Sequence, residues 1–420
     1  MTNAMNAKTY LFLLLFWVVV VHLDAQDVRQ CDATSSLEDA LIQHPELAQK
    51  RAEVESNIQA FLTNGKTVNR DALVIPIVFH VVYFSESENI SDQQIYSQIA
   101  VLNRDYRKKN SNLSSVHPDF QKVAADIGFE FCLAEKDPFG NETNGITRTQ
   151  TPYPNIGIKN NFDGRKNIYY SDLGGEDAWD TQKYLNVWVC RMGDNILGTG
   201  SFPGGAIPSE VGVVIDLEAF GTMGTAQSPN NLGKTLVHEI GHYFDLQHVW
   251  GNVIGDCNVD DGIADTPEQE RPTRGCPIER KVSCGSFDMY NDYMDYSDDA
   301  CLAMFTFGQK ERMLAALQTA RPNLLNTDIC SEKALESPLE KIKLHTNPVD
   351  DELFLSLTEG NIFEASATFY DVWGQVVLAT ELFYFPGNYP IDVSHLPQGL
   401  YFVVLSSSDA QVVRKIIVNH

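Results

Sequence analysis

The sequence predicts a mixed α/β (α+β) domain with a twisted mixed sheet, followed by a small all-β sandwich. Two observations support this fold class. Up to residue 330, apolar β-rich runs alternate with segments of helical spacing, which is the order of elements in α/β domains. Beyond residue 341, only short β-rich runs separated by turns remain, as in a sandwich. The chain has 420 residues, of which 43% are hydrophobic, and this is enough for two or three domains with substantial cores.

The N-terminal residues are typical of a signal peptide. Lys8 precedes an apolar run over residues 10–21, and Ala25 is a small residue at a suitable cleavage point. The run is short for a transmembrane helix, so an uncleaved membrane anchor is the weaker alternative. We therefore expect residues 1–25 to be removed and the mature protein to be exported with no membrane-spanning segment.

The next elements are helical and then extended. Residues 36–62 are polar and helix-prone, and a turn follows them at Asn64 and Gly65. The uninterrupted apolar run Leu73–Tyr83 predicts a central strand buried on both faces. Pro76 counts against a central position, because proline has no N–H to donate to a neighbouring strand.

Helices and strands then alternate. Ser91–Arg107 has helical spacing, and we expect Ser91 to cap this helix, with Gln94 completing a capping box. The remaining elements of this part are predicted strands over 127–134, 184–190 and 211–217 and predicted helices over 231–246 and 308–317. A polar linker over 331–341 precedes the β-rich runs of the sandwich, at 353–357, 367–370, 375–379, 399–405 and 412–418.

Charge and cysteine content limit the partners and the compartment. A formal net charge of −25 argues against nucleic acid or an anionic membrane as the main partner, and it suits basic peptides and cations. In an exported chain most of the eight cysteines should form disulfides. Four of them lie in the loop-like stretch from Cys257 to Cys301, where three pairings are open. Cys132 and Cys190 lie in two predicted strands, and we hypothesise a further bridge between them.

The segment His238-Glu239-Ile240-Gly241-His242, with His248 six residues later, predicts a catalytic zinc site. Histidines four residues apart lie on one face of a helix, so His238 and His242 can bind one metal ion. His248 becomes a third ligand if the helix ends before it, and three protein ligands leave one position open. The Glu239 carboxylate can then take a proton from water and pass it to the leaving amine. A surface helix that happens to carry histidines is the alternative.

The extended motif resembles that of the metzincin metallopeptidases, and specifically the ulilysin-like pappalysins, over nearly all of residues 26–330. Asp292-Tyr293-Met294-Asp295-Tyr296 matches their methionine turn. The resemblance implies that Met294 forms the base of the metal site and that Tyr296 hydrogen-bonds the tetrahedral intermediate. Further matching stretches are Asp265-Thr266-Pro267, Asp298-Asp299-Ala300-Cys301 with Met304-Phe305-Thr306, and Leu197–Pro203, which resembles the edge strand that pairs with substrate.

One residue departs from the family motif. Asp245 occupies the position where the family usually has a glycine in the left-handed conformation. Asp and Asn are the non-glycine residues that best tolerate this conformation, so we expect the turn toward His248 to form at a modest cost.

The resemblance also implies two disulfides, a second metal ion and synthesis as an inactive zymogen. It suggests the crossed disulfides Cys257–Cys284 and Cys276–Cys301. It places a calcium ion at Asp261 and Thr266, against the alternative of a plain solvated acidic loop. Cys31 would occupy the open position of the zinc and hold a prosegment over residues 26–69 in a latent zymogen. A disulfide between Cys31 and Cys330 is the competing possibility.

The resemblance further implies a substrate preference. In ulilysin an acid at the position that matches Asp299 lines the pocket for the residue after the scissile bond, so we expect cleavage before Arg, or Lys. The alternative is that Asp299 only pairs with a local cation such as Arg312. Cleavage at Asn69-Arg70 would release the prosegment and leave a catalytic domain over residues 70–330.

Residues 342–420 resemble the C-terminal sorting domain of the type IX secretion pathway. The matching residues are Asn347-Pro348-Val349, Tyr370-Asp371-Val372-Trp373-Gly374, Leu396–Phe402 and Arg414–Val418. The resemblance implies type IX secretion machinery as a partner and a secreted or cell-surface location. A β-sandwich that binds carbohydrate or protein is the alternative.

The predicted function is therefore that of a secreted zinc endopeptidase that acts on proteins or peptides. Two other classes are weighed: a calcium-braced surface adhesin on a dead peptidase scaffold, and a zinc storage or sensor protein. The complete set of histidines with Glu239 argues against the adhesin, because decay would usually remove the base first. Glu239 also argues against the storage or sensor protein, because storage needs no proton shuttle.

Overall fold

The computed structural model describes residues 30–65, 72–158, 166–193, 195–325, 327–330, 339, 342–345, 347–357, 363–384, 387–407 and 411–420. The expected signal peptide, the Asn69-Arg70 bond and nearly all of the expected linker lie outside the described residues. Among the described helices, none combines the length and the apolar character that a membrane span requires.

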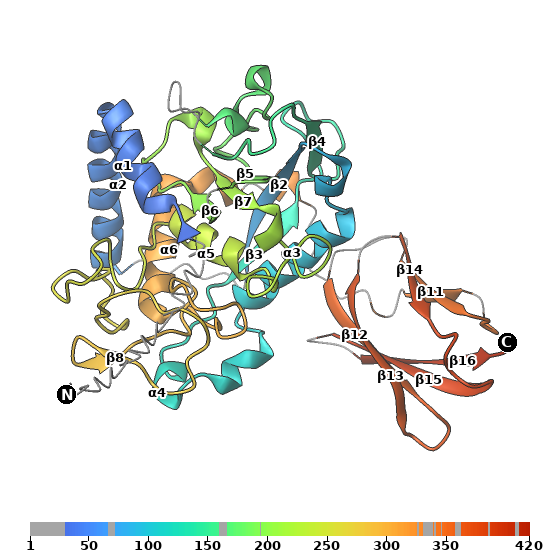
Figure 1. Ribbon diagram of the computed structural model, residues 1–420. Coiled ribbons are helices and arrows are strands. Elements are labelled where there is room, and N and C mark those ends of the chain that lie inside the picture. The colour runs from blue at the N-terminus through green and yellow to red at the C-terminus, as the bar shows by residue number, and fades with distance from the viewer. Residues whose placement is uncertain are drawn as a thin grey trace, which may run out of the picture.

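A seven-stranded twisted sheet forms the centre of the larger domain (Figure 1). Its strands follow the order β1-β6-β7-β5-β2-β3, and β4 pairs with β2. β6 runs antiparallel to β7, whereas the other pairs are parallel, so the sheet is mixed. The strands are β1 Gln30–Cys31, β2 Leu73–Tyr83, β3 Phe129–Leu133, β4 Ile146–Gln150, β5 Leu185–Cys190, β6 Ile196–Gly200 and β7 Val213–Asp216.

The strand β2 is central and almost wholly buried, as its apolar sequence predicts. Pro76 is tolerated because β5 begins to pair with β2 only at Ile77. At Pro76 itself, β2 has only the register partner Cys132 on β3. The missing N–H of the proline therefore leaves no acceptor unpaired on the β5 side.

Two helices, α3 Asp92–Asp105 and α5 Lys234–Tyr243, pack with the sheet around the main hydrophobic core. α5 is shorter than the helix predicted over 231–246, because Gly233 adopts a left-handed conformation directly before it. Ser91 caps α3 through the Gln94 N–H, as predicted. The expected second half of the capping box is wrong, since the Gln94 side-chain oxygen accepts the Thr225 N–H instead of the Ser91 N–H.

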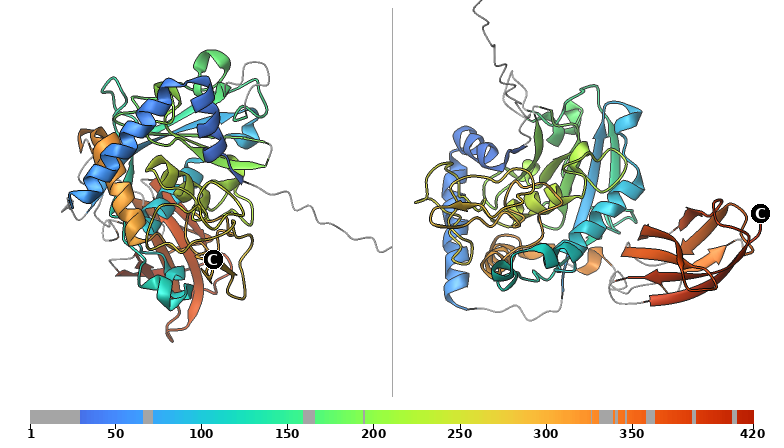
Figure 2. Two further views of the ribbon diagram at one scale, coloured as in Figure 1. Left: turned by 90° about the vertical axis from the view of Figure 1, so that its left-hand side faces the viewer. Right: turned by 60° about the horizontal axis from the view of Figure 1, so that its bottom comes forward.

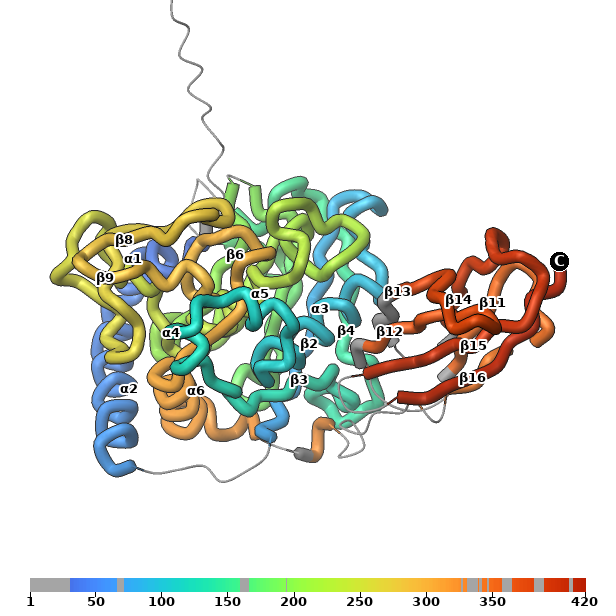
Figure 3. The backbone as a smooth tube through the Cα atoms, turned by 90° about the horizontal axis from the view of Figure 1, so that it is seen from below, coloured from blue at the N-terminus to red at the C-terminus, as the bar shows by residue number. Residues whose placement is uncertain are grey.

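The N-terminal residues form two helices that lie across the larger domain. They are α1 Ala33–Gln43 and α2 Glu46–Thr63, and Pro45 separates them within the region predicted as helix-prone. α2 lies alongside α6 Phe307–Ala320, with Ile58 packed against Ala315 and Ala316 (Figure 2 and Figure 3). Other short elements include α4 Pro118–Gln121 and the hairpin β8 Val282–Ser283 and β9 Ser286–Phe287.

The C-terminal residues form a separate antiparallel sandwich with its own core. One sheet has the order β10-β11-β14 and the other has the order β13-β12-β15-β16. The strands are β10 Lys343–His345, β11 Glu352–Leu357, β12 Phe363–Tyr370, β13 Val376–Tyr384, β14 Gly387–Asp392, β15 Gly399–Ser406 and β16 Gln411–Val418. Sequence reasoning missed β10 and β14, which are short or contain Pro390.

Candidate active site

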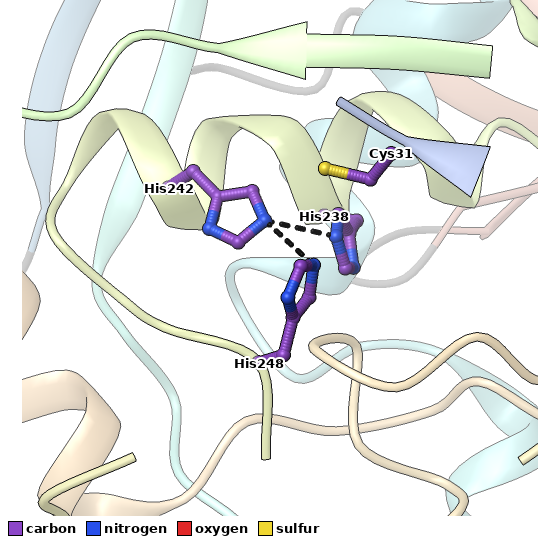
Figure 4. A group of neighbouring side chains, drawn as sticks. All are labelled: Cys31, His238, His242 and His248. Atoms are coloured by element: carbon purple, nitrogen blue, oxygen red, sulfur yellow. Dashed lines mark hydrogen bonds between the residues drawn. The ribbon is translucent and has the colours of Figure 1, made fainter. Parts of the chain in front are cut away.

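Three imidazoles converge below the strand β1 (Figure 4). The Nε2 atom of His242 lies 3.1 Å from Nε2 of His238 and 3.1 Å from Nε2 of His248. Ligands of a tetrahedral zinc ion, at about 2.0–2.1 Å from the metal, lie roughly 3.3 Å apart. The three nitrogens therefore have the spacing that one zinc ion requires.

The outer ring nitrogens set the protonation of the histidines. Nδ1 of His238 lies 2.7 Å from the Tyr293 carbonyl oxygen, and Nδ1 of His242 lies 2.7 Å from the Leu246 carbonyl oxygen. A carbonyl only accepts, so each Nδ1 carries the proton and each Nε2 keeps its lone pair. Burial lowers the pKa of His238 to about 4 and holds the pKa values of His242 and His248 well below the ordinary value. All three imidazoles are thus neutral, as metal ligands must be.

The chain turns toward His248 at Asp245. This residue has a φ of 76°, so it adopts the left-handed conformation, as predicted from its place in the motif. Its side chain is fully buried and forms ion pairs with Arg51 at 2.5 Å and with Arg312 at 2.7 Å. The position of His248 therefore depends on a buried carboxylate that is neutralised from two helices.

Met294 lies against the part of α5 that carries the histidines. It is fully buried, and a Cβ atom on Gly241 would come within 2.4 Å of its sulfur. Any larger residue at this position between His238 and His242 would therefore force the Met294 side chain to shift. The main-chain N–H of Met294 donates to the Asp292 carboxylate at 2.8 Å, which holds the turn in place.

Glu239 follows His238 on α5 and lines the same cavity. Its side chain is completely buried, and β6 passes so close that a Cβ on Gly198 would meet the Glu239 Cγ at 2.7 Å. The Cys31 thiol donates to Glu239 Oε2 at 3.4 Å. Burial raises the pKa of Glu239 to about 8, against the stabilising effects of this thiol and of the Gly200 N–H. Burial thus disfavours the charged form of this carboxylate.

Cys31 reaches the three histidines from the N-terminal segment. Its sulfur and one nitrogen of each of His238, His242 and His248 all lie within 4.8 Å of one another. The strand β1 pairs with β6, and the Asp32 N–H donates to the Gly198 carbonyl at 2.9 Å. The alternative disulfide from Cys31 is wrong, because Cys31 is free.

Tyr296 closes the site from the other side. Its hydroxyl donates to the Cys31 carbonyl at 3.3 Å, and its ring packs edge-on against His248 and Trp250. The guanidinium of Arg274 lies 4.8 Å from the centre of the same ring. Sequence reasoning missed Arg274 and Trp250, whose spacing from the motif carries no signal.

A cavity of about 410 Å³ opens beside His238 and Glu239, and Asp298 and Asp299 both line it. Asp299 is buried, and its Oδ2 accepts the N–H of Leu232 at 2.7 Å. Burial raises the pKa of Asp299 to about 6. The alternative pairing of Asp299 with Arg312 is not formed.

Disulfides brace the loop that leads to the methionine turn. Cys257 is joined to Cys284, and Cys276 is joined to Cys301. Within that loop, Asp295 accepts the N–H of Thr273 at 2.8 Å and so ties the loop to the turn. Sequence reasoning gave Asp295 no role of its own.

The hypothesised bridge between Cys132 and Cys190 is wrong. Cys132 is bonded to Cys330, and Cys190 is free. The strands β3 and β5 pair with opposite edges of β2, so they are two strand spacings, about 9–10 Å, apart. A disulfide needs Cα atoms within about 7 Å, and this pair therefore cannot form one.

Asp261 and Thr266 lie together, as the sequence resemblance implies. The Thr266 hydroxyl donates to Asp261 Oδ1 at 2.8 Å, while the buried Oδ2 of Asp261 accepts no hydrogen bond from the described residues. Burial raises the pKa of Asp261 to about 7. Asp265 has a different role, since it accepts the Thr306 hydroxyl and the Gly308 N–H at the start of α6.

Comparisons with known proteins agree with this geometry. A family model described as pregnancy-associated plasma protein-A matches residues 169–318, and one described as a secretion system C-terminal sorting domain matches residues 343–419. An extracellular metalloprotease of Pyricularia oryzae is 32% identical over 73% of this chain and 94% of its own length.

Two solved structures from Tannerella forsythia are also similar. Mature mirolysin in complex with a cleaved peptide is 44% identical, with a TM-score of 0.58, over 61% of this chain and 96% of that chain. A promirolysin mutant is 40% identical, with a TM-score of 0.63, over 71% of this chain and 97% of that chain. With the sorting domain, these matches indicate a secreted or cell-surface metalloprotease made as a zymogen. The chain belongs to the pappalysin family of metzincin metallopeptidases, and it carries a type IX secretion sorting domain.

Proposed function

We propose that this protein is a zinc endopeptidase in which His238, His242 and His248 hold the metal and Glu239 transfers the proton. The observation that supports this most directly is the convergence of three neutral Nε2 atoms beside a buried carboxylate. A bound zinc ion would polarise the scissile carbonyl and lower the pKa of water toward neutrality.

The protein residues supply proton transfer, stabilisation of the substrate oxygen and pairing with the substrate backbone. Glu239 takes a proton from the attacking water and delivers it to the leaving amine. Tyr296, whose hydroxyl donates to the Cys31 carbonyl in the zymogen, donates to the substrate oxygen that gains charge once Cys31 has left. The edge of β6 that β1 occupies would be free to pair with substrate backbone.

Digestion of a peptide library by the purified, processed protein tests the proposed function. We expect cleavage that a zinc chelator abolishes and that added zinc restores. Zinc binding without turnover would instead favour the dead scaffold, and cleavage that persists without metal would remove the zinc mechanism.

Latency is the next part of the proposal. Cys31 lies at the histidines, and it is held there by β1 and by Tyr296. We propose that residues 26–69 form the prosegment of the zymogen, ahead of a catalytic domain over 70–330, and that the Cys31 thiol takes the fourth position at the metal.

Cys31→Ser should raise the activity of the uncut zymogen by about tenfold or more. The reason is that each 1.4 kcal/mol removed from the free energy that holds the prosegment over the site raises the fraction of open molecules tenfold. The lag before full activity should also shorten. Activity assays on the intact zymogen measure both effects. The matched control is Ser35→Ala, an exposed change in the same segment. Equal activity of Cys31→Ser and the control would exclude Cys31 as the latch.

We further propose that the enzyme cleaves before Arg, and less well before Lys. Asp298 and Asp299 line the cavity beside Glu239, and a partly dry carboxylate can bind a guanidinium in a bidentate manner. Asp299 is the better candidate because it is held rigidly by main-chain N–H groups. A substrate cation would share this acidic lining with Arg274.

Asp299→Asn should lower the ratio of kcat/KM for Arg over Leu after the scissile bond by about 10–100-fold, since hydrogen bonds to charged groups contribute about 1.5–3 kcal/mol. The asparagine oxygen can still accept the Leu232 N–H, so the start of α5 should keep its structure. Profiling with matched peptides measures the ratio, and the exposed change Asp172→Asn is the control. An unchanged ratio would remove Asp299 from the pocket.

Two further proposals follow from the sequence. We propose that the enzyme matures by cleavage at Asn69-Arg70, which N-terminal sequencing of the active form would identify. We also propose that residues 342–420 engage the type IX secretion machinery, joined to the catalytic domain by a linker over 331–341. The match of the sorting-domain model to residues 343–419 supports the latter.

A calcium ion at Asp261 and Thr266 is proposed as well. The unpaired Oδ2 of Asp261 supports it, and so does Asp292, whose buried Oδ2 also accepts no hydrogen bond from the described residues. Burial holds the pKa of Asp292 well above its ordinary value, and the charge of Asp261 raises it further. A bound cation would stabilise both carboxylates.

A further inference from the structure

The prosegment contacts the larger domain at a second place, away from Cys31. Arg51 on α2 pairs with Asp245 Oδ1 at 2.5 Å. Arg312 on α6 pairs with Asp245 Oδ2 at 2.7 Å and with Glu55 on α2 at 2.7 Å. These four residues form an alternating chain of two cations and two anions, which we call the anchor cluster.

The anchor cluster is largely removed from water. The side chain of Asp245 is 0% exposed, that of Arg312 is 8% exposed and that of Arg51 is 17% exposed. Only Glu55, at 40%, is substantially exposed. A buried charge is costly unless it is paired, so the two halves of the cluster stabilise one another.

Apolar contacts near the anchor cluster also hold α2 against the larger domain. Ile58 of α2 is completely buried against Ala315 and Ala316 of α6. The Arg51 guanidinium lies 5.7 Å from the centre of the Phe202 ring. A Cβ on Gly204 would meet the Val54 side chain at 3.1 Å, so α2 is in close contact with the chain that follows β6.

None of these contacts depends on the chain between α2 and β2. The prosegment residues that make these contacts, like Cys31, all lie within residues 30–65. Cutting the connecting chain would therefore leave every described contact of the prosegment in place.

We propose that the cut prosegment stays bound to the mature enzyme through the anchor cluster and inhibits it as a separate chain. Asp245 and Arg312 are its receptor, and Arg51 and Glu55 are the residues that the receptor recognises. This inference rests on the proposed latency, and it adds that cleavage of the connection does not by itself activate the enzyme. Full activity requires that the prosegment also dissociate or be degraded.

This proposal explains why an aspartate stands at position 245, where the family motif usually has a glycine. A glycine at this left-handed position would form the turn toward His248 with less strain, but it could not bind Arg51. The carboxylate thus makes the turn a specific recognition site for this prosegment. The competing explanation is purely structural: Asp245 and Arg312 alone would fix the turn, and Arg51 would add nothing.

The test is made in the full zymogen with Glu239→Ala, so that binding is measured without any proteolysis by the protein itself. A cleavage site for another protease is inserted after Gly65, and Cys31→Ser removes the contact at the metal. After the cut, the dissociation constant of the prosegment is measured by dilution and gel filtration.

Arg51→Met should weaken binding of the cut prosegment by about 10–100-fold, because it leaves Asp245 buried with only one partner. Glu55→Gln should weaken it by about two- to fivefold, since Glu55 is partly exposed. The matched controls are Lys50→Met and Glu53→Gln, which change exposed residues one or two positions away on the same helix. Both controls should bind like the unmodified prosegment.

A double-mutant cycle between Arg51 and Asp245 distinguishes recognition of the prosegment from a purely structural role of Asp245. Asparagine tolerates the left-handed conformation, so Asp245→Asn removes the charge and keeps the turn. In that background the effect of Arg51→Met should shrink to less than about threefold. Immediate release of the unmodified prosegment after the cut, or equal effects of Arg51→Met and Lys50→Met, would overturn the proposal. Because the assay needs no activity, failure of the proposed chemistry would not affect its result.

Discussion

Glu239→Gln will lower kcat/KM by about 10²–10⁴-fold, the usual contribution of a positioned acid or base, while the zinc content stays that of the unmodified enzyme. Glutamine has the same shape, so it fits the close approach of Gly198 to the Glu239 side chain. It cannot take a proton from water. The three Nε2 atoms are untouched, and main-chain carbonyls set the tautomers of His238 and His242. The variant should therefore bind zinc normally while it loses most of its catalytic activity.

Peptide cleavage and metal analysis of the processed enzyme measure the two quantities. Glu268→Gln, an exposed change outside α5, is the matched control and should behave like the unmodified enzyme. Activity of Glu239→Gln within tenfold of the control would show that another group moves the proton. Loss of zinc together with activity would make Glu239 a structural residue of the site.

Cys132→Ala with Cys330→Ala will lower the free energy of unfolding by about 2–5 kcal/mol. The bond joins residues 198 positions apart and ties the segment after α6 to β3. It lies in a small buried cluster with Val78, Tyr184 and Ile329, so the unfolded chain loses a long-range constraint and the native packing loses two sulfur atoms. The effect should be among the largest for any change outside the metal site.

Urea unfolding of the zymogen in the inactive Glu239→Ala background measures this loss without self-digestion. Cys190→Ala is the control, because Cys190 is also buried but has no disulfide. It should destabilise the protein only by the small cavity that it leaves. Equal losses in the two variants would mean that packing, and not the cross-link, accounts for the effect.

Local features of the chain could be predicted because they depend on nearest neighbours. The spacing of His238 and His242 places both on one helical face, and the run Leu73–Tyr83 forms the central strand with the predicted bounds. The left-handed turn at Asp245 was also predictable, because backbone sterics limit which residues adopt it. Element ends were less accurate, as the shorter α5 shows.

By itself, then, the sequence determined the fold class, the histidine motif and the sorting domain, since each depends on patterns of residues that are close together along the chain. Only the tertiary structure decided that Cys330 bonds Cys132, because the order of strands, which no local pattern encodes, keeps Cys190 two strands away. It also decided that the Gln94 amide binds the Phe220 carbonyl and that Arg51 neutralises Asp245. These contacts join segments that meet only in the packed domain, where a buried polar group must find a partner at whatever sequence distance the fold supplies one.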